Sequence, residues 1–129
     1  MTETFKKLNY KGQNPILVMG APESFERELL AASSESEVHR SSQAGVGYAF
    51  LIAFAPMKED LLTAAKTLLR ASTPDAVIWF AYPKQSSKKL RSDLNRDACR
   101  ETLEPLSFET VRQIAVDEDW SALRVKRTS

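Results

Sequence analysis

Residues 48–55 read Tyr-Ala-Phe-Leu-Ile-Ala-Phe-Ala, a continuous apolar run near the middle of the chain. Two similar runs occupy residues 15–21 (Pro-Ile-Leu-Val-Met-Gly-Ala) and 76–82 (Ala-Val-Ile-Trp-Phe-Ala-Tyr). None of them alternates apolar with polar side chains, as a strand with one face in water would. Strands that are apolar on both faces are typical of parallel sheets, which helices cover on both sides. These runs therefore predict a mostly parallel sheet.

Helical patterns lie between the apolar runs. Residues 57–71 place apolar side chains on one helix face, with acidic residues in the first turn and Arg70 in the last. Another helix is expected to begin near Glu23, with Phe25, Leu29 and Leu30 as its apolar side chains. A third is predicted over residues 93–104, because Pro105 disfavours helical geometry at the residue before it. Helices that alternate with buried strands predict an α/β protein.

The two ends of the chain differ from this alternation. Residues 108–116 and 120–126 are rich in β-forming side chains and flank a short acidic turn, so they predict an antiparallel hairpin. Residues 38–42 predict a short edge strand, and residues 1–12 a polar lead-in. The apolar side chains expected to dock this lead-in on the body are Phe5, Leu8 and Tyr10. The order predicts a three-layer α/β sandwich, formed as one domain over residues 1–129.

Composition places the chain among ordinary globular proteins. It has 129 residues, of which 43% are hydrophobic and 27% charged, and a formal net charge of +1. That charge gives no general attraction to nucleic acid or to an anionic membrane. Cys99 is the only cysteine, so no internal disulfide points to an oxidising compartment. Because no signal-peptide core and no bilayer-length apolar run is present, we expect a cytoplasmic protein.

The elements expected from residue 48 onward resemble the second half of the class I methyltransferase fold, which also ends in a hairpin with one antiparallel strand. More closely, the stretches 14–25, 82–97 and 115–124 resemble a family of small bacterial proteins of unknown function. The first contains Asn-Pro-Ile-Leu-Val and Ala-Pro-Glu-Ser-Phe, the second Tyr-Pro-Lys and Asp-Leu-Asn-Arg-Asp, and the third Asp-Trp-Ser-Ala-Leu-Arg. The resemblance implies a truncated Rossmann-like fold and a bacterial cytosolic origin, but no particular activity.

The turn after the first strand lacks the pattern of a cofactor site. A dinucleotide or S-adenosylmethionine site needs a glycine-rich turn there, so that the backbone can approach the ligand. Residues 19–25 hold a single glycine, Gly20, followed by Pro22 and Glu23. No acidic residue ends the strand predicted over residues 38–42, where such sites hold the ribose hydroxyls. We therefore expect no cofactor.

Residues 84–95, which we call the basic loop, form the strongest candidate site. Positive side chains gather there and leave the carboxyl end of a central strand, the edge at which open α/β sheets bind ligands. The loop is expected to hold an anionic ligand or a nucleic-acid backbone; the alternative is a solvated lysine-rich loop. The candidate ligand-binding residues are Glu23, Lys84, Ser86, Ser87, Lys88, Lys89, Arg91, Asn95 and Trp120.

Several other residues favour structural roles. Trp120 is expected to close one end of the core, and the acidic turn of residues 117–119 is expected to be a turn and not a metal site. His39 is predicted on the surface of an edge strand, without catalytic partners. Cys99 is predicted as a buried structural thiol. These interpretations leave no catalytic residue and no metal ligand.

Three functions remain open from the sequence. The favoured one is a non-enzymatic binding or regulatory module with a degenerate Rossmann-like fold. One alternative is a methyltransferase-like or nucleotide-handling enzyme, whose site would combine Glu23, Lys84, Ser86 and Asn95. Another is an interaction subunit that pairs through a sheet edge or the C-terminal hairpin. The substrate, the partner and the oligomeric state do not follow from the sequence.

Overall fold

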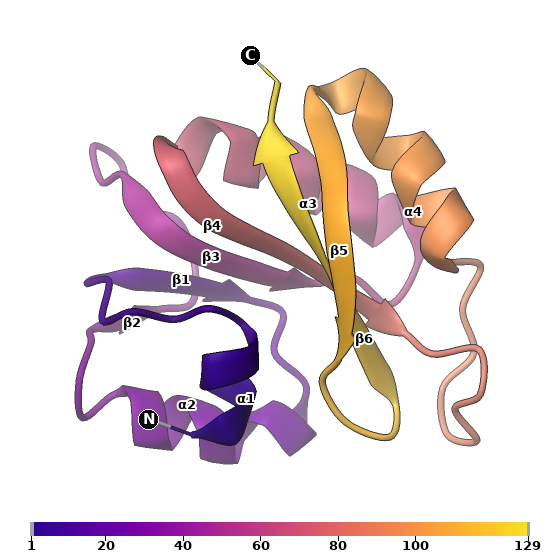
Figure 1. Cartoon of the computed structure of the whole chain (residues 1–129), viewed down its shortest axis with the longest axis horizontal. Coiled ribbons are helices and arrows are strands. Elements are labelled where there is room, and N and C mark those ends of the chain that lie inside the picture. The colour runs from indigo at the N-terminus through magenta and orange to yellow at the C-terminus, as the bar shows by residue number, and fades with distance from the viewer. Residues whose placement is uncertain (1, 129) are drawn as a thin grey trace.

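The computed structural model describes residues 2–128 and is built around a six-stranded sheet of order β2-β1-β3-β4-β6-β5 (Figure 1). The strands are β1 (Ile16–Met19), β2 (Val38–His39), β3 (Tyr48–Phe54), β4 (Ser72–Pro83), β5 (Phe108–Ala115) and β6 (Trp120–Arg127). The helices are α1 (Glu3–Lys7), α2 (Glu26–Ala32), α3 (Lys58–Ala71) and α4 (Arg96–Leu103), with short 3-10 turns η1 (Glu23–Phe25) and η2 (Glu104–Leu106). The predicted order of strands and helices is confirmed.

The first four strands run parallel to one another, and β6 runs antiparallel to both of its neighbours, β4 and β5. β1 pairs with β2 on one side and with β3 on the other, and β3 pairs with β4. The C-terminal hairpin then joins the sheet through β6, which runs antiparallel to β4. The expected mostly parallel sheet with a C-terminal antiparallel hairpin is therefore present.

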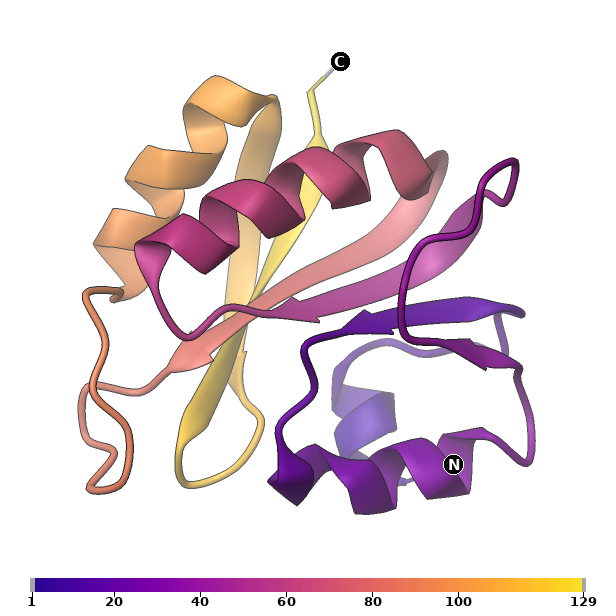
Figure 2. The same cartoon turned by 180° about the vertical axis from the view of Figure 1, so that it is seen from behind.

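Helices cover both faces of the sheet, as a three-layer sandwich requires. α3 and α4 pack on one face, which Figure 2 shows in front of the strands. α1 and α2 belong to the core of the other face, around the fully buried Trp79. The indole N–H of Trp79 donates to the carbonyl of Leu8 over 2.8 Å and fixes the end of α1.

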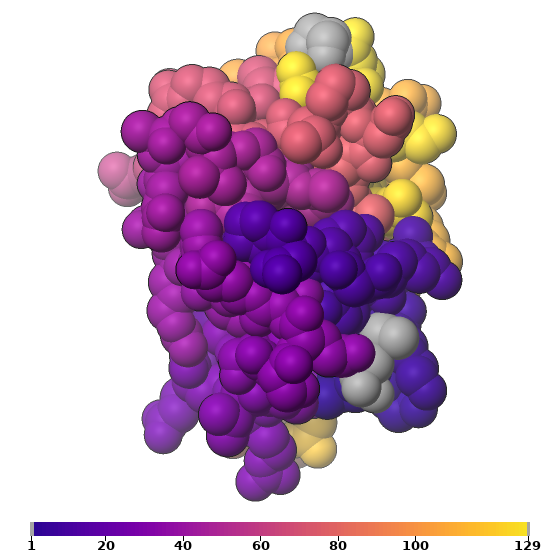
Figure 3. Space-filling model, turned by 90° about the vertical axis from the view of Figure 1, so that its left-hand side faces the viewer, coloured from indigo at the N-terminus to yellow at the C-terminus, as the bar shows by residue number. Residues whose placement is uncertain are grey.

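The N-terminal segment is more ordered than a polar lead-in. Thr2 caps α1 by accepting the N–H of Phe5, and the three predicted docking side chains are almost fully buried. Figure 3 shows this indigo segment lying against the purple residues that follow it. The docking prediction is confirmed, and the short helix is an addition to it, because five residues carry too weak a periodic signal to be recognised.

Two predictions of exposure were wrong. Leu30, expected on the inner face of α2, is 76% exposed. His39, expected on the surface, is 8% exposed, and its ring packs edge-on against the ring of Tyr48 in β3, with 5.4 Å between centroids. The Tyr48 hydroxyl accepts the N–H of Gln43 and forms a hydrogen bond of 2.5 Å with Nδ1 of His39.

Strands β5 and β6 extend beyond the helices of the α1 and α2 layer, and in Figure 1 no helix among the described residues covers the side of these strands that faces the viewer. β5 is the edge strand at this end of the sheet, and most of its side chains are exposed, including Val111. An arginine on each strand, Arg112 and Arg124, faces its partner across the pair in register.

Candidate functional site

The ends of β1 and β3 form the crevice where open α/β sheets usually bind ligands. The chain leaves β1 for β2 on one side and returns to β3 on the other, which makes this the topological switch point. Gly20 directly follows β1 and has φ +69°, and a Cβ there would lie 2.8 Å from the carbonyl oxygen of Phe54. The glycine therefore allows the turn to press against β3, and this close packing leaves no space between the two backbones at that point.

Aromatic side chains fill the adjacent space. The ring of Phe54 contacts Phe25 at 4.9 Å and Trp120 at 5.2 Å between centroids, and all three are almost fully buried. Trp120 thus packs in the core, the role that the sequence favoured for it. Its ring is not offered to a ligand at the surface.

An ion pair joins the end of β2 to the start of α2. Both terminal nitrogens of Arg40 donate to the carboxylate of Glu26 over 2.7 Å, and this hydrogen bonding holds the Glu26 pKa below its usual range. Where an acid would hold ribose hydroxyls, the chain carries an arginine already engaged with α2. Glu23 is exposed at the start of η1, and it lines neither of the cavities beside the basic loop.

One end of the basic loop is tied to the turn between β5 and β6. The N–H of Lys84 donates to the carbonyl of Asp119, and the Ser87 hydroxyl donates to the Asp119 carboxylate over 2.7 Å. The same hydroxyl accepts the N–H groups of Lys89 and Leu90. Ser87 therefore holds the loop in place, and its donor is not free for a ligand.

The C-terminal end of the basic loop is tied to the starts of helices α3 and α4. The Ser92 hydroxyl donates to the carbonyl of Pro56, and the Asp93 carboxylate accepts the N–H of Lys58 at the start of α3. Asn95 caps α4 by accepting the N–H of Ala98 over 2.7 Å. The loop is therefore fixed at both ends.

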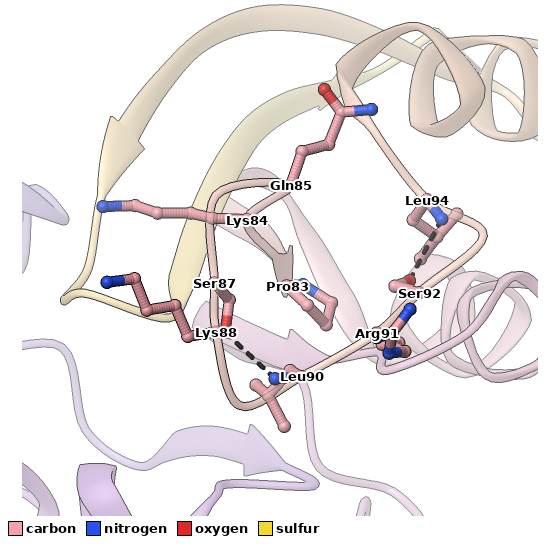
Figure 4. A pocket seen from close by; sticks show the side chains of 9 residues that line it. All are labelled: Pro83, Lys84, Gln85, Ser87, Lys88, Leu90, Arg91, Ser92 and Leu94. Atoms are coloured by element: carbon pink, nitrogen blue, oxygen red, sulfur yellow. Dashed lines mark hydrogen bonds between the residues drawn. The ribbon is translucent and has the colours of Figure 1, made fainter.

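A cavity of about 560 Å³ opens inside this loop (Figure 4). Figure 4 shows the side chains of Lys84 and Lys88 extending together to one side of the loop, whereas Arg91 lies on the other side. Lys89 and Ser86 do not line the cavity. The expected basic side chains are therefore close in sequence, but they do not converge on one point.

A second cavity, of about 460 Å³, lies beside the same loop and draws on several elements. Its lining residues are Tyr82, Lys84, Gln85, Ser86, Asn95, Arg96, Gln113 and Ser121. They come from the end of β4, the basic loop, the start of α4 and both strands of the hairpin. The structure thus brings together Lys84, Ser86 and Asn95 of the predicted set.

Two positively charged side chains, those of Lys84 and Arg96, line the second cavity. Neither Lys84 nor Arg96 forms an ion pair within residues 2–128. At the wall, the Tyr82 hydroxyl donates to the side-chain carbonyl of Gln113 over 2.7 Å. Burial raises the pKa of Tyr82 to about 12, so its phenol stays protonated near neutral pH. The cavity offers positive charge and hydrogen-bonding groups but no base.

Part of this lining was not predicted from the sequence. Arg96 directly follows Asn95, and Tyr82 directly precedes the loop, so both stood next to predicted site residues. Gln113 and Ser121 gave no local signal. Ser121 enters the cavity because the register of β4 and β6 places it opposite Tyr82, and Gln113 enters it from β5, where it accepts the Tyr82 hydroxyl.

Other reactive side chains have structural roles. Cys99 is fully buried, and burial raises its pKa to about 12, which suits an inert thiol. The Asp117 carboxylate accepts the N–H groups of Asp119 and Trp120 and so shapes the acidic turn. Within residues 2–128 no group of three or more His, Cys, Asp or Glu side chains is placed to hold a metal ion. None of the described helices is long and apolar enough to cross a membrane.

No protein-family profile matches the sequence, and no curated protein matches it. Solved structures do match the fold. A SAM-dependent methyltransferase from Aquifex aeolicus aligns with TM-score 0.63 at 13% identity, over 95% of this chain and 88% of that chain. Ribosomal protein L11 methylase from Lactobacillus delbrueckii subsp. bulgaricus aligns with TM-score 0.61 at 12% identity, over 98% and 75% respectively.

A third solved structure extends this result. An S-adenosylmethionine-dependent methyltransferase from Clostridium acetobutylicum ATCC 824 aligns with TM-score 0.60 at 6% identity, over 98% of this chain and 89% of that chain. Identities this low bear on the fold and not on the chemistry. The chain therefore has a methyltransferase-like α/β fold, with a mixed six-stranded sheet and an antiparallel β4-β6-β5 edge.

Proposed function

We propose that this protein binds a small anionic molecule, bearing a phosphate or carboxylate group, in the cavity of about 460 Å³ beside the basic loop. The observation that supports this proposal is the pair of cations, Lys84 and Arg96, which share one cavity with polar side chains and form no ion pair within residues 2–128. An anion that bridges them would gain charge-assisted hydrogen bonds from both.

The surroundings favour an anion further. The cavity lies at the carboxyl edge of β4, where α/β sheets bind ligands. The start of α4 also lines it, and the backbone of a helix start favours negative charge. Ser121 and Gln113 add polar groups from the hairpin. The rigid ties at both ends of the loop reduce the ordering that binding would require.

The experiment compares matched neutral variants of the basic loop and the start of α4. Calorimetric titration with inorganic phosphate, pyrophosphate, adenosine monophosphate and citrate identifies the anion class. For the ligand that binds, Lys84→Gln and Arg96→Gln are each expected to weaken affinity by about 10- to 100-fold, the value of a hydrogen bond to a charged group. Lys89→Gln, in the same loop but outside both cavities, serves as the control and is expected to leave affinity within about twofold.

The outcomes separate this cavity from the rest of the loop. Equal weakening by Lys84→Gln and Lys89→Gln would indicate general attraction to a basic surface. A single-stranded oligonucleotide whose binding depends on Lys88 and Lys89, and not on Arg96, would identify the loop as a nucleic-acid surface. No binding by any anion would also refute the proposal.

A methyltransferase-like enzyme is the second candidate, and the structural likenesses support it over a module without activity. The closed turn at Gly20 and the Arg40–Glu26 pair argue against an adenosyl ligand at the usual crevice. A thermal-shift titration decides this, since a ligand that binds only the native state must stabilise it. A saturable rise in melting temperature with S-adenosylmethionine would support the enzyme, and its absence would leave the anion-binding proposal as the better one.

A further inference from the structure

A second group of cations lies far from the basic loop, on the strands of the hairpin. A cavity of about 300 Å³ opens between the beginning of β4 and the end of β6. Its lining residues are Pro74, Asp75, Ala76, Arg124, Lys126 and Arg127. Asp75 and Tyr82 stand near opposite ends of β4, about 23 Å apart at the usual rise of a strand. This cavity is therefore separate from the one at the carboxyl edge.

Both arginines of this cavity have hydrogen-bonding capacity that the protein does not use. The Nε atoms of Arg124 and Arg127 are buried and have no hydrogen-bond partner. Arg127 is held in place because one of its terminal nitrogens donates to the carbonyl of Ser72 over 2.9 Å. Buried donors of this kind normally have a partner, and each one left without it costs free energy.

Like charges gather at this place without a paired acid. Arg112 lies opposite Arg124 in register, with its guanidinium 5.8 Å from the centre of the Trp79 ring. Burial and the charge of Arg112 both lower the pKa of Arg124. Asp75 is exposed, and neither it nor Glu109, which is opposite Lys126, forms an ion pair within residues 2–128.

We propose that this cavity is an oxyanion site, in which a phosphate or carboxylate group accepts hydrogen bonds from Arg124 and Arg127. The guanidinium fork suits both groups, because its planar donors match paired oxygens. Lys126 adds a further charge at the rim. The site would let the protein hold a second anionic ligand, or the distal end of a molecule with several acidic groups. It does not depend on the function proposed above.

Arginine side-chain NMR signals test this site directly. Uniformly ¹⁵N-labelled protein is titrated with inorganic phosphate, and in a separate arm with acetate, while sodium chloride keeps the ionic strength constant. The Nε–H signals of Arg124 and Arg127 are expected to shift together and to saturate. The signal of Arg40, which is already paired with Glu26, is the internal control and is expected not to shift. The arm that saturates at lower concentration identifies the oxyanion.

Two variants connect the shift to the site. Arg124→Lys keeps the charge but loses the fork, and is expected to weaken phosphate binding at Arg127 by about tenfold. Lys89→Gln removes a charge from the basic loop outside all three cavities and is expected to leave this titration unchanged. The proposal is overturned if the shifts stay linear in both arms, if Arg40 shifts equally, or if Arg124→Lys binds as tightly as the original protein while remaining folded by its backbone spectrum.

Discussion

Replacing Gly20 with alanine tests the statement that the crevice at the end of β1 is closed. Gly20 has φ +69°, a left-handed conformation that side chains with a Cβ rarely adopt. The new Cβ would also lie 2.8 Å from the carbonyl oxygen of Phe54, a contact with backbone and not with a flexible side chain. The strand β3 is paired on both sides at this level, so it has little freedom to move away.

The expected loss of stability in Gly20→Ala combines two effects. A left-handed conformation costs a residue with a Cβ about 1 to 2 kcal/mol, and overpacking of a filled site adds about 1 to 3 kcal/mol. Gly20→Ala should therefore lower the free energy of unfolding by about 2 to 5 kcal/mol. Because small domains are stable by only about 5 to 15 kcal/mol, this is a large share of the total.

Gly45→Ala separates the two effects. Gly45 has φ +80° in a turn, but a Cβ there meets nothing within 4 Å, so this variant carries the conformational cost alone. Urea unfolding of both variants, followed by far-UV circular dichroism, gives the two losses on one scale. Equal losses, within about 0.5 kcal/mol, would refute the reasoning, because the turn would then have room for a side chain and the crevice would not be closed.

Three further predictions follow from the structure. Asn95→Ala should destabilise by about 1 kcal/mol through loss of the α4 cap, whereas Asn95→Asp should retain the cap, both measured by urea unfolding. Trp120→Ala should cost about 3 to 5 kcal/mol as it empties the aromatic cluster with Phe54, measured in the same way. Burial holds the pKa of Cys99 at about 12, above its ordinary 9.0. The thiol of the unfolded chain therefore ionises first, and the stability of the fold should decrease as pH rises above about 9. Cys99→Ala should reduce this decrease, as measured by thermal unfolding at alkaline pH.

Much of the fold could be predicted because its signals are local. The run at residues 48–55 predicted β3, and the stripe at residues 57–71 predicted α3, each within one residue of its observed ends. β4 was predicted to start at residue 76 but begins at Ser72, immediately after α3. Ser72 to Asp75 include polar and β-breaking residues, so only pairing with a neighbour, here Tyr48 opposite Ser72, shows that this stretch is extended.

The candidate site was predicted in part. The basic loop was found from its charge, and its position at the carboxyl edge followed from the parallel strands. The direction of each side chain did not follow. Lys84 and Lys88 were expected to act with Arg91, but Figure 4 shows Arg91 on the other side of the loop. The other cation that lines the second cavity with Lys84 is Arg96, which the sequence assigned to the first turn of a helix.

The sequence by itself determined the class of the protein: three apolar runs with helices between them could bury their surface only as strands covered on both faces. It also determined that the turn after β1 lacks the glycines of a cofactor loop. Only the tertiary structure decided which cations share a cavity: Lys84 and Arg96 line one cavity, and Arg124 and Arg127 line another. Hydrophobic periodicity is a property of neighbours along the chain, whereas the lining of a cavity depends on segments far apart in it, such as those that carry Tyr82 and Gln113.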